Sequence, residues 1–128
     1  MAPTAMGDQG DLHEMTASFI GAWKKAWEMS AGANGDMDGY LAYYSDRFTA
    51  GGFDKETWAM DKTRKNRRKA WIRIEISDIR VSLPADTTRT EVRFFQDYRS
   101  SNYASQGEKL IVLSKETEGW KIICERSF

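Results

Sequence analysis

The sequence predicts one α+β domain, with three helices first and an antiparallel sheet after them. Two observations predict this class. Apolar residues recur every three or four positions up to about residue 69, as in helices, and then every second position, as in strands. Helices followed by strands with hairpin-length loops indicate helices packed on one face of an antiparallel sheet. The 128 residues suffice for one domain with its own core.

The first helix is predicted over 11–29, with Asp11 as its N-cap. Its apolar positions are Leu12, Met15, Phe19, Trp23, Ala26 and Trp27. Residues 1–10 are small and polar, so we expect a flexible tail there. The domain itself is therefore expected to cover 11–128.

Two further helices are predicted before the sheet. The first of them is capped by Asp36, and its apolar stripe consists of Met37, Tyr40, Leu41 and Tyr44. A short irregular or extended piece around Phe48 follows. The third helix is predicted over 55–69, with Asp54 as its N-cap.

Period-two alternation then predicts four strands. They cover about 72–77, 89–103, 108–116 and 120–126, with turns at 84–86, 105–107 and 118–119. A strongly twisted sheet around three helices makes a cone. The open mouth of such a cone is a natural pocket.

One face of the long strand changes character along its length. Val92 and Phe94 are apolar, whereas Gln96, Tyr98 and Ser100 are polar, and all five fall on one side of a strand. Two interpretations remain open. The polar groups are satisfied inside the core, because buried polar groups need partners, or they line the pocket and hold a ligand.

A family resemblance is carried by residues along most of the chain. They are Trp23, Ala26, Trp27, Tyr40, Tyr44, Phe48, Trp58, Lys62, Trp71, Ile72, Val92, Phe94, Gln96, Tyr98, Ser100, Tyr103, Lys109, Leu110, Trp120, Lys121, Ile122 and Glu125. With them the chain resembles the nuclear transport factor 2-like superfamily. The closer resemblance is to the accessory domain C-terminal to bacterial L,D-transpeptidase and L,D-carboxypeptidase-type cell-wall enzymes.

This resemblance covers about 19–126, and the Phe-x-Gln-x-Tyr-x-Ser strand is its most specific part. It implies a cone-shaped fold in which three N-terminal helices pack on a strongly curved, mainly antiparallel sheet of four or more strands. Residues 30–35 form a longer loop than the family's short acidic link, so we expect a reshaped pocket rim.

The residues expected to line the pocket and bind a ligand are Trp23, Trp27, Tyr40, Tyr44, Trp58, Lys62, Phe94, Gln96, Tyr98 and Ser100. The aromatic members also suit a simple hydrophobic core, which three helices on a curved sheet require. The alternative is a platform on which a sugar or another flat ligand stacks.

Three functions follow as hypotheses. The first is a non-catalytic ligand-binding or interaction domain, which the resemblance links to the bacterial envelope and peptidoglycan. The second is a SnoaL-like isomerase or dehydratase acting on a hydrophobic ligand, with Glu125, Asp97 or Glu75 as base and Tyr98 as donor. The third is a protein-only dimeric scaffold.

Charge and cysteine content exclude several classes of site. Lys plus Arg equals Asp plus Glu, 19 each, so net charge indicates no polyanionic partner. The basic residues of 62–69 are expected to form a solvated helix end, and no nucleic-acid partner is expected. Cys124 and His13 are the only residues of their types, so we expect no disulfide, no metal and no cofactor.

The expected partner is a second copy of the chain. It would bind through the outer sheet face, formed by Arg93, Phe95, Asp97 and Arg99. No apolar stretch reaches the length of a membrane span, and residues 1–10 lack the pattern of a signal peptide. This pattern favours a cytoplasmic protein, whereas the resemblance favours the envelope if an upstream part is missing.

Overall fold

The computed structural model describes residues 3–82 and 88–128, and it confirms the α+β class. The helices are α1 (Pro3–Met29), α2 (Met37–Leu41) and α3 (Lys55–Arg67). The strands are β1 (Tyr44–Ala50), β2 (Phe53–Asp54), β3 (Ile72–Ser82), β4 (Arg89–Ser100), β5 (Tyr103–Glu116) and β6 (Gly119–Ser127). The predicted turn at 84–86 lies outside the described residues.

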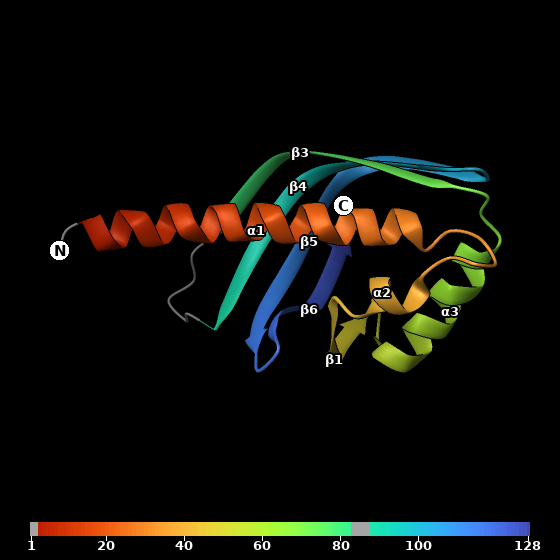
Figure 1. Cartoon of the computed structure of the whole chain (residues 1–128), viewed down its shortest axis with the longest axis horizontal. Helices are drawn as coiled ribbons and strands as arrows, with labels where there is room; N and C mark the ends of the chain where they lie inside the picture. Colours follow the sequence, from red (N-terminus) through yellow and green to blue (C-terminus); the bar gives the residue numbers. More distant parts are fainter. Residues whose placement is uncertain (1–2, 83–87) are drawn as a thin grey trace.

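The strands form one open, mixed sheet in the order β2-β1-β6-β5-β4-β3. Only the pairing of β1 with β6 is parallel among the described strands. Figure 1 shows α1 running across the strongly curved strands, with α2 and α3 together near its C-terminal end. The helices therefore cover one face of the sheet, and none of the three described helices lies on the other face.

The first helix begins earlier than the sequence predicts. It starts at Pro3, so Asp11 lies inside it and is not its N-cap. Proline suits a helix start because its fixed φ matches the helix and its missing N–H needs no partner there. The first turns of α1 extend past the sheet (Figure 1), which is why no core periodicity marks them in the sequence.

The prediction that Tyr44 belongs to the second helix is wrong. That helix ends at Leu41, and Tyr44 begins β1. The backbone N–H of Ile122 donates to the carbonyl oxygen of Tyr43 at 2.9 Å, which joins β1 to the far end of the chain. Local spacing cannot reveal a strand whose partner is so distant. The sequence predicted only a short irregular or extended piece around Phe48, inside β1, and it did not predict β2.

The turn predicted at 105–107 is also wrong. These residues lie inside β5, and the chain turns at Ser101 and Asn102. The Ser101 hydroxyl accepts from the backbone N–H of Ala70 at 2.8 Å, which fixes this turn against the end of the third helix. Gly107 lies within β5, where a Cβ would stand 2.8 Å from the Phe128 carbonyl oxygen, so the position favours glycine for a reason other than a turn.

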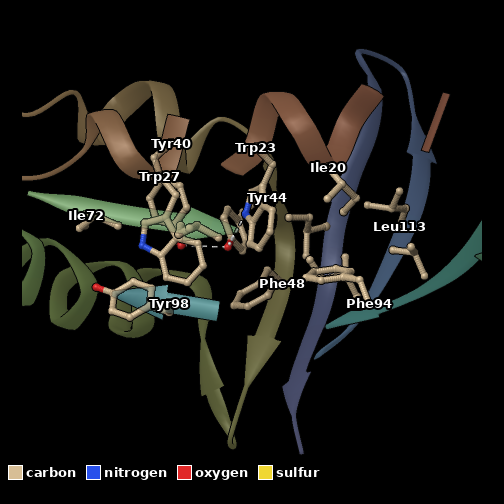
Figure 2. Close-up of a cluster of buried hydrophobic side chains, with 14 residues drawn as sticks. Ile20, Trp23, Trp27, Tyr40, Tyr44, Phe48, Ile72, Phe94, Tyr98 and Leu113 are labelled. Carbon is tan, nitrogen blue, oxygen red and sulfur yellow. Dashed lines mark hydrogen bonds between the residues drawn. The ribbon is translucent and has the colours of Figure 1, made fainter. Parts of the chain in front are cut away.

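Both remaining helix caps are confirmed. The Asp36 carboxylate accepts from the backbone N–H of Gly39 at 2.9 Å, and Asp54 accepts from Thr57 at the same distance. The core lies between the helices and the concave side of the sheet. Figure 2 shows its aromatic centre, where Trp23, Trp27 and Tyr40 face strand residues.

Candidate functional site

A cavity of about 600 Å³ opens between the C-terminal half of α1, one face of α3, the C-terminal end of β4 and the N-terminal end of β5. That size suits a small-molecule ligand. Its lining residues are Trp27, Lys62, Lys65, Asn66, Lys69, Gln96, Tyr98, Asn102, Tyr103, Ser105, Lys109 and Ser127. We call this space the cavity throughout.

The structure divides the predicted pocket residues into two groups. Those that line the cavity are Trp27, Lys62, Gln96 and Tyr98. Those that do not are Trp23, Tyr40, Tyr44, Trp58, Phe94 and Ser100. The second group is buried or half-buried, and its aromatic members pack in the core. The alternation in the sequence identified the strand face that points inward, but it did not show which residues of that face line the cavity and which pack in the core.

Aromatic rings form one wall of the cavity. The rings of Trp27 and Tyr98 lie 5.1 Å apart between centroids, and those of Tyr98 and Tyr103 lie 6.3 Å apart. Tyr98 sits below Trp27 with its hydroxyl pointing away from Tyr44 (Figure 2). Burial raises the pKa of the Tyr98 hydroxyl, so it remains a neutral hydrogen-bonding group.

A chain of buried hydrogen bonds supports the floor of the cavity. The Tyr44 hydroxyl accepts from the Trp23 indole at 3.0 Å and lies 3.0 Å from the Tyr40 hydroxyl. Figure 2 shows these groups meeting at one point. Tyr44 in turn donates to Glu125 Oε1 at 2.7 Å. Burial, then the charge on Glu125, raises the pKa of Tyr44 well above its usual value, so its proton stays in place.

Glu125 is the only carboxylate in this chain of contacts, and it is paired. Lys109 Nζ donates to its Oε2 at 2.9 Å, and the two side chains are 6% and 11% exposed. Burial alone would raise the pKa of the Glu125 carboxyl. The ammonium groups of Lys109 and Lys62 overcome this effect and hold the pKa below its usual value. Glu125 is therefore an ionised anchor for Lys109.

Lys62 is the cation that the site leaves without an acceptor. Its Nζ stands 4.7 Å from the centre of the Trp27 ring and has no hydrogen-bond acceptor among the described residues. Burial lowers its pKa to about 8, although the charge on Glu125 opposes the shift. A mostly protonated, half-buried ammonium thus faces the cavity at neutral pH.

The basic residues of α3 separate into two faces. Lys62, Lys65 and Lys69 line the cavity, whereas Arg64 and Arg67 line a shallow groove on the outer side of the helix. The prediction of a solvated helix end is therefore wrong for Lys62 and Lys69, which are half-buried, whereas Lys65 is exposed. Their spacing of three and four residues was the signal that could have grouped them.

Two buried polar atoms of the cavity wall lack partners in the described part of the chain. They are the indole nitrogen of Trp27 and the amide oxygen of Gln96. Gln96 is 8% exposed, so its oxygen is not satisfied by the surrounding core as the simpler interpretation required. The Ser100 hydroxyl, by contrast, is satisfied and accepts from Lys69 Nζ at 3.1 Å.

The loop at 30–35 is held firmly beside the cavity. The Asn66 side-chain amide donates to the Ser30 hydroxyl at 2.9 Å, and the Asn66 backbone carbonyl oxygen accepts from the Gly32 N–H at 3.0 Å. Asn66 is also a lining residue. The loop therefore holds the C-terminal part of α3 in place through Asn66, and so helps to position one side of the cavity.

The other two carboxylates considered as general bases lie elsewhere. Asp97 and Glu75 are on the outer face of the sheet, next to Arg73 and Arg99. Neither contributes to the cavity lining. Sequence reasoning also missed Lys69, because the turn that brings Asn102 beside it was misplaced; Lys69 Nζ donates to Asn102 Oδ1 at 2.7 Å.

Comparison with known proteins identifies the fold. Residues 15–126 match the family model described as the Cds6 C-terminal NTF2-like domain. No curated protein matches the sequence. Among the described residues, no helix combines the length and apolar composition that crossing a membrane requires.

Three solved structures illustrate the likeness. Bd1075 of Bdellovibrio bacteriovorus has a TM-score of 0.77 and 25% identity, covering 89% of this chain and 39% of that protein. The helical cell shape determining protein Pgp2 of Campylobacter jejuni has a TM-score of 0.67 and 28% identity, covering 84% and 38%. An NTF2-like protein of unknown function from Pseudomonas putida has a TM-score of 0.73 and 13% identity, covering 92% and 86%. This chain thus matches less than half of the first two proteins.

Proposed function

This chain belongs to the Cds6 C-terminal NTF2-like domain family, and from this premise we propose that it is a non-catalytic ligand-binding domain for anionic ligands. The observation that carries the proposal is the charge of the cavity. Four lysines line it, and carboxylates pair with only two of them: Glu125 with Lys109, and Asp61 with Lys65. Lys62 in particular is a half-buried cation for which residues 3–82 and 88–128 supply no hydrogen-bond acceptor, and such a group favours an incoming anion.

The ligand class we propose is a peptidoglycan fragment. Its stem peptide carries carboxylates for the lysines, and its sugars offer flat faces that pack on aromatic rings such as Trp27, Tyr98 and Tyr103. The likeness to a helical cell shape determining protein supports this choice, since peptidoglycan sets bacterial cell shape. The setting we propose is therefore the bacterial envelope.

A role as an isomerase or dehydratase has less support. General-base catalysis inside an apolar cone needs a carboxyl whose pKa is raised toward neutrality. The pKa of Glu125 is lowered by Lys109 and Lys62, and its oxygens already bond to Tyr44 and Lys109. Neutralisation of a bound anion, rather than proton abstraction, is the chemistry that these contacts favour.

The direct test is a calorimetric titration with soluble peptidoglycan fragments. We expect saturable binding that weakens about 10- to 100-fold in Lys62→Gln, the effect of losing a hydrogen bond from a charged donor. Arg68→Gln, at the C-cap of the same helix but outside the cavity, is the matched control and should bind as wild type. Affinity should also fall as pH rises through about 8, where Lys62 loses its proton.

Two results would contradict the proposal. One is the absence of binding at millimolar fragment. The other is binding that Lys62→Gln and Arg68→Gln weaken equally, which would place the ligand outside the cavity.

We also propose that the chain forms a homodimer through the outer face of the sheet. In the sequence this face was assigned to Arg93, Phe95, Asp97 and Arg99. Their side chains alternate with buried residues along β4, and Phe95 is 39% exposed. An exposed aromatic ring among charges of both signs suits a self-association surface.

A further inference from the structure

Three polar groups around the inner end of the cavity have no partner in the described part of the chain. They are the Lys62 ammonium, the Trp27 indole N–H and the Gln96 amide oxygen. Trp27 and Gln96 are only 3% and 8% exposed, and buried polar groups are almost always hydrogen-bonded. Three unpaired groups in the wall of one cavity therefore indicate a ligand that bonds to all of them.

Gln96 is left unpaired because the neighbouring strand offers it no side chain. It stands directly opposite Gly107 of β5, whereas Phe94 and Tyr98, on the same face of β4, stand opposite Lys109 and Ser105. A smaller cavity of about 250 Å³ opens beside Gly107. The residues that line both cavities are Gln96, Tyr103, Ser105, Lys109 and Ser127. Gln96 therefore stands where two adjoining spaces can hold parts of one ligand.

The two unpaired donors lie together at the Trp27 ring. Lys62 Nζ and Lys109 Nζ stand 4.7 Å and 4.9 Å from the centre of this ring, but Lys109 already donates to Glu125. Figure 2 shows the indole nitrogen of Trp27 pointing away from Tyr44, so it takes no part in the buried chain of hydrogen bonds. The Lys62 ammonium and the Trp27 N–H are therefore the donors that a ligand can still use.

The unpaired acceptor lies within reach of the same ligand group. Gln96 is two residues from Tyr98 along β4, a separation of about 7 Å, and the Tyr98 ring lies 5.1 Å from that of Trp27. One amino-acid residue extends about 3.5 Å, and a hydrogen bond at each end adds about 3 Å. A single residue of a ligand can therefore bond to the donors at one end and to Gln96 at the other.

The partners that these groups require are a carboxylate and an amide N–H. A carboxylate neutralises the Lys62 ammonium, and its second oxygen can accept from the Trp27 indole. The amide oxygen of Gln96 can only accept, so its partner must be a donor. Sulfate offers no donor to Gln96, and a neutral sugar offers no charge to Lys62. The last residue of a peptide carries both required groups on neighbouring atoms.

We infer that the cavity binds the free C-terminal end of a peptide, with the terminal carboxylate on Lys62 and Trp27 and the last peptide N–H on Gln96. The inference rests on the proposed function, because the stem peptides of peptidoglycan supply such ends wherever they are not cross-linked. The smaller cavity gives room to the side chain of the last residue.

The rest of the peptide leaves through the mouth of the cavity. Tyr103 and Lys65 are exposed there, and Lys69 is held in place by Ser100 and Asn102. These groups can contact any part of a ligand, whereas the inner groups require a terminal charge. A peptide whose carboxyl group is joined to another residue lacks that charge, so the cavity should distinguish free ends from linked ends.

Three small probes test the inference on the wild-type protein by two-dimensional NMR. They are N-acetylalanylalanine, its C-terminal primary amide, and its depsipeptide, in which an ester oxygen replaces the last N–H. Each is titrated in the L,L and D,D configurations, and the tighter one is then used throughout. The acid should bind and shift the Trp27 indole signal, which Trp27→Phe identifies. The amide should bind about 10- to 100-fold more weakly, because a charged hydrogen bond is lost, and the depsipeptide about 3- to 10-fold more weakly, because a neutral one is lost.

Two substitutions assign each effect to its residue. In Lys62→Gln the acid and the amide should bind almost equally, while the depsipeptide remains weaker than the acid. In Gln96→Met the acid and the depsipeptide should bind almost equally, while the amide remains weaker. Arg68→Gln, at the C-cap of α3 and outside the cavity, should retain both differences. The NMR spectrum of each variant shows whether it is folded, and the wild-type titrations do not depend on any variant.

The inference is wrong if the acid does not bind at millimolar concentration, if the amide or the depsipeptide binds as tightly as the acid, or if the Trp27 indole signal does not move. Soluble peptidoglycan fragments are titrated alongside. If they bind and the acid does not, the proposed function stands and the recognition of free ends fails. If the acid binds and the fragments do not, the recognition of free ends stands and peptidoglycan is not the source of the peptide.

Discussion

The two faces of β4 show how burial changes what a charged residue does. On the inner side, the strand contributes Gln96 and Tyr98 to the cavity, where Lys109 and Glu125 are 6% and 11% exposed. On the outer side, Asp97 and Arg99 are 21% and 62% exposed. Both faces hold an ion pair, at 2.9 Å and 3.4 Å respectively.

The difference between these pairs lies in their surroundings. The inner pair is removed from water, so the ion pair alone does not compensate the lost hydration. The hydrogen bond from Tyr44 and the charge of Lys62 also stabilise Glu125, and each of these groups therefore depends on the others. The outer pair is screened by solvent and contributes little to stability. We therefore expect the inner charges to contribute much more to the free energy of unfolding than the outer charges do.

The largest expected effect is the loss of the inner anchor. Glu125→Gln removes the negative charge next to Lys109 and Lys62 and disturbs the hydrogen bond from Tyr44. We expect the free energy of unfolding to fall by about 3–5 kcal/mol, because two buried ammonium groups lose their counter-charge. Urea denaturation at neutral pH measures this change, with the exposed Glu118→Gln as the control.

At acidic pH, the free energies of unfolding of wild type and Glu125→Gln should become more similar. The folded pKa of Glu125 is lowered, so its stabilisation is complete above the unfolded value of about 4.3 and is lost as pH falls through the folded one. A constant gap from pH 7 to pH 3 would show that the effect is steric and not electrostatic.

The second effect concerns Lys62, and it has a pH dependence of the same sign in a higher pH range. Its folded pKa of about 8 is below the unfolded value, so between these values the unfolded state binds more protons. The cost of burying the charge is present below about pH 8 and is relieved as pH rises above it. Relative to Lys62→Met, wild type should gain about 3 kcal/mol from pH 7 to pH 10. Thermal or urea unfolding across this pH range measures the change. A difference in unfolding free energy between wild type and Lys62→Met that does not vary with pH would contradict the prediction.

A smaller effect is expected from the hydroxyl that links the core to the cavity. Tyr44→Phe leaves the Trp23 indole without its acceptor and Glu125 with one donor fewer. We expect a loss of about 2 kcal/mol, the cost of buried polar groups left unsatisfied. Tyr43→Phe is the control, because no side-chain hydrogen bond of Tyr43 is recorded in the described part of the chain. Equal losses in the two variants would argue against the hydrogen-bonded chain.

The smallest effect should come from the outer face. Arg99→Ala removes an exposed ion pair, and we expect the unfolding free energy to change by less than about 0.5 kcal/mol. The measurement is made on dilute protein, so that association does not contribute to stability. If Arg99→Ala lowered the unfolding free energy as much as Glu125→Gln does, the outer ion pair would contribute as much to stability as the inner one, which would contradict the comparison.

The sequence predicted the fold well where structure depends on local periodicity. The alternation of β4 and the caps at Asp36 and Asp54 are all as expected. It failed where partners are distant: β1 depends on β6, and the turn at Ser101 depends on Ala70. A single sequence carries no local mark of such pairings.

The candidate site was predicted in part for a similar reason. Gln96 and Tyr98 were found because one strand face turns polar, and they do line the cavity. Glu125 was considered as a base, but its pairing with Lys109 could not be deduced from spacing because the two residues lie on different strands. The cationic character of the cavity therefore emerged only when α3, β5 and β6 were placed together.

The hydrogen bond between Tyr44 and Glu125 also has a consequence for the order of folding. It joins residues 81 positions apart, and β1 pairs with β6 across a similar span. Contacts of such long sequence separation pay a large loop-closure entropy and tend to form late. During synthesis, the last strand must leave the ribosome before Glu125 can meet Tyr44. We therefore expect the hairpin of β4 and β5 to form early. The cavity should be complete only after β6 has paired with β1, late in folding.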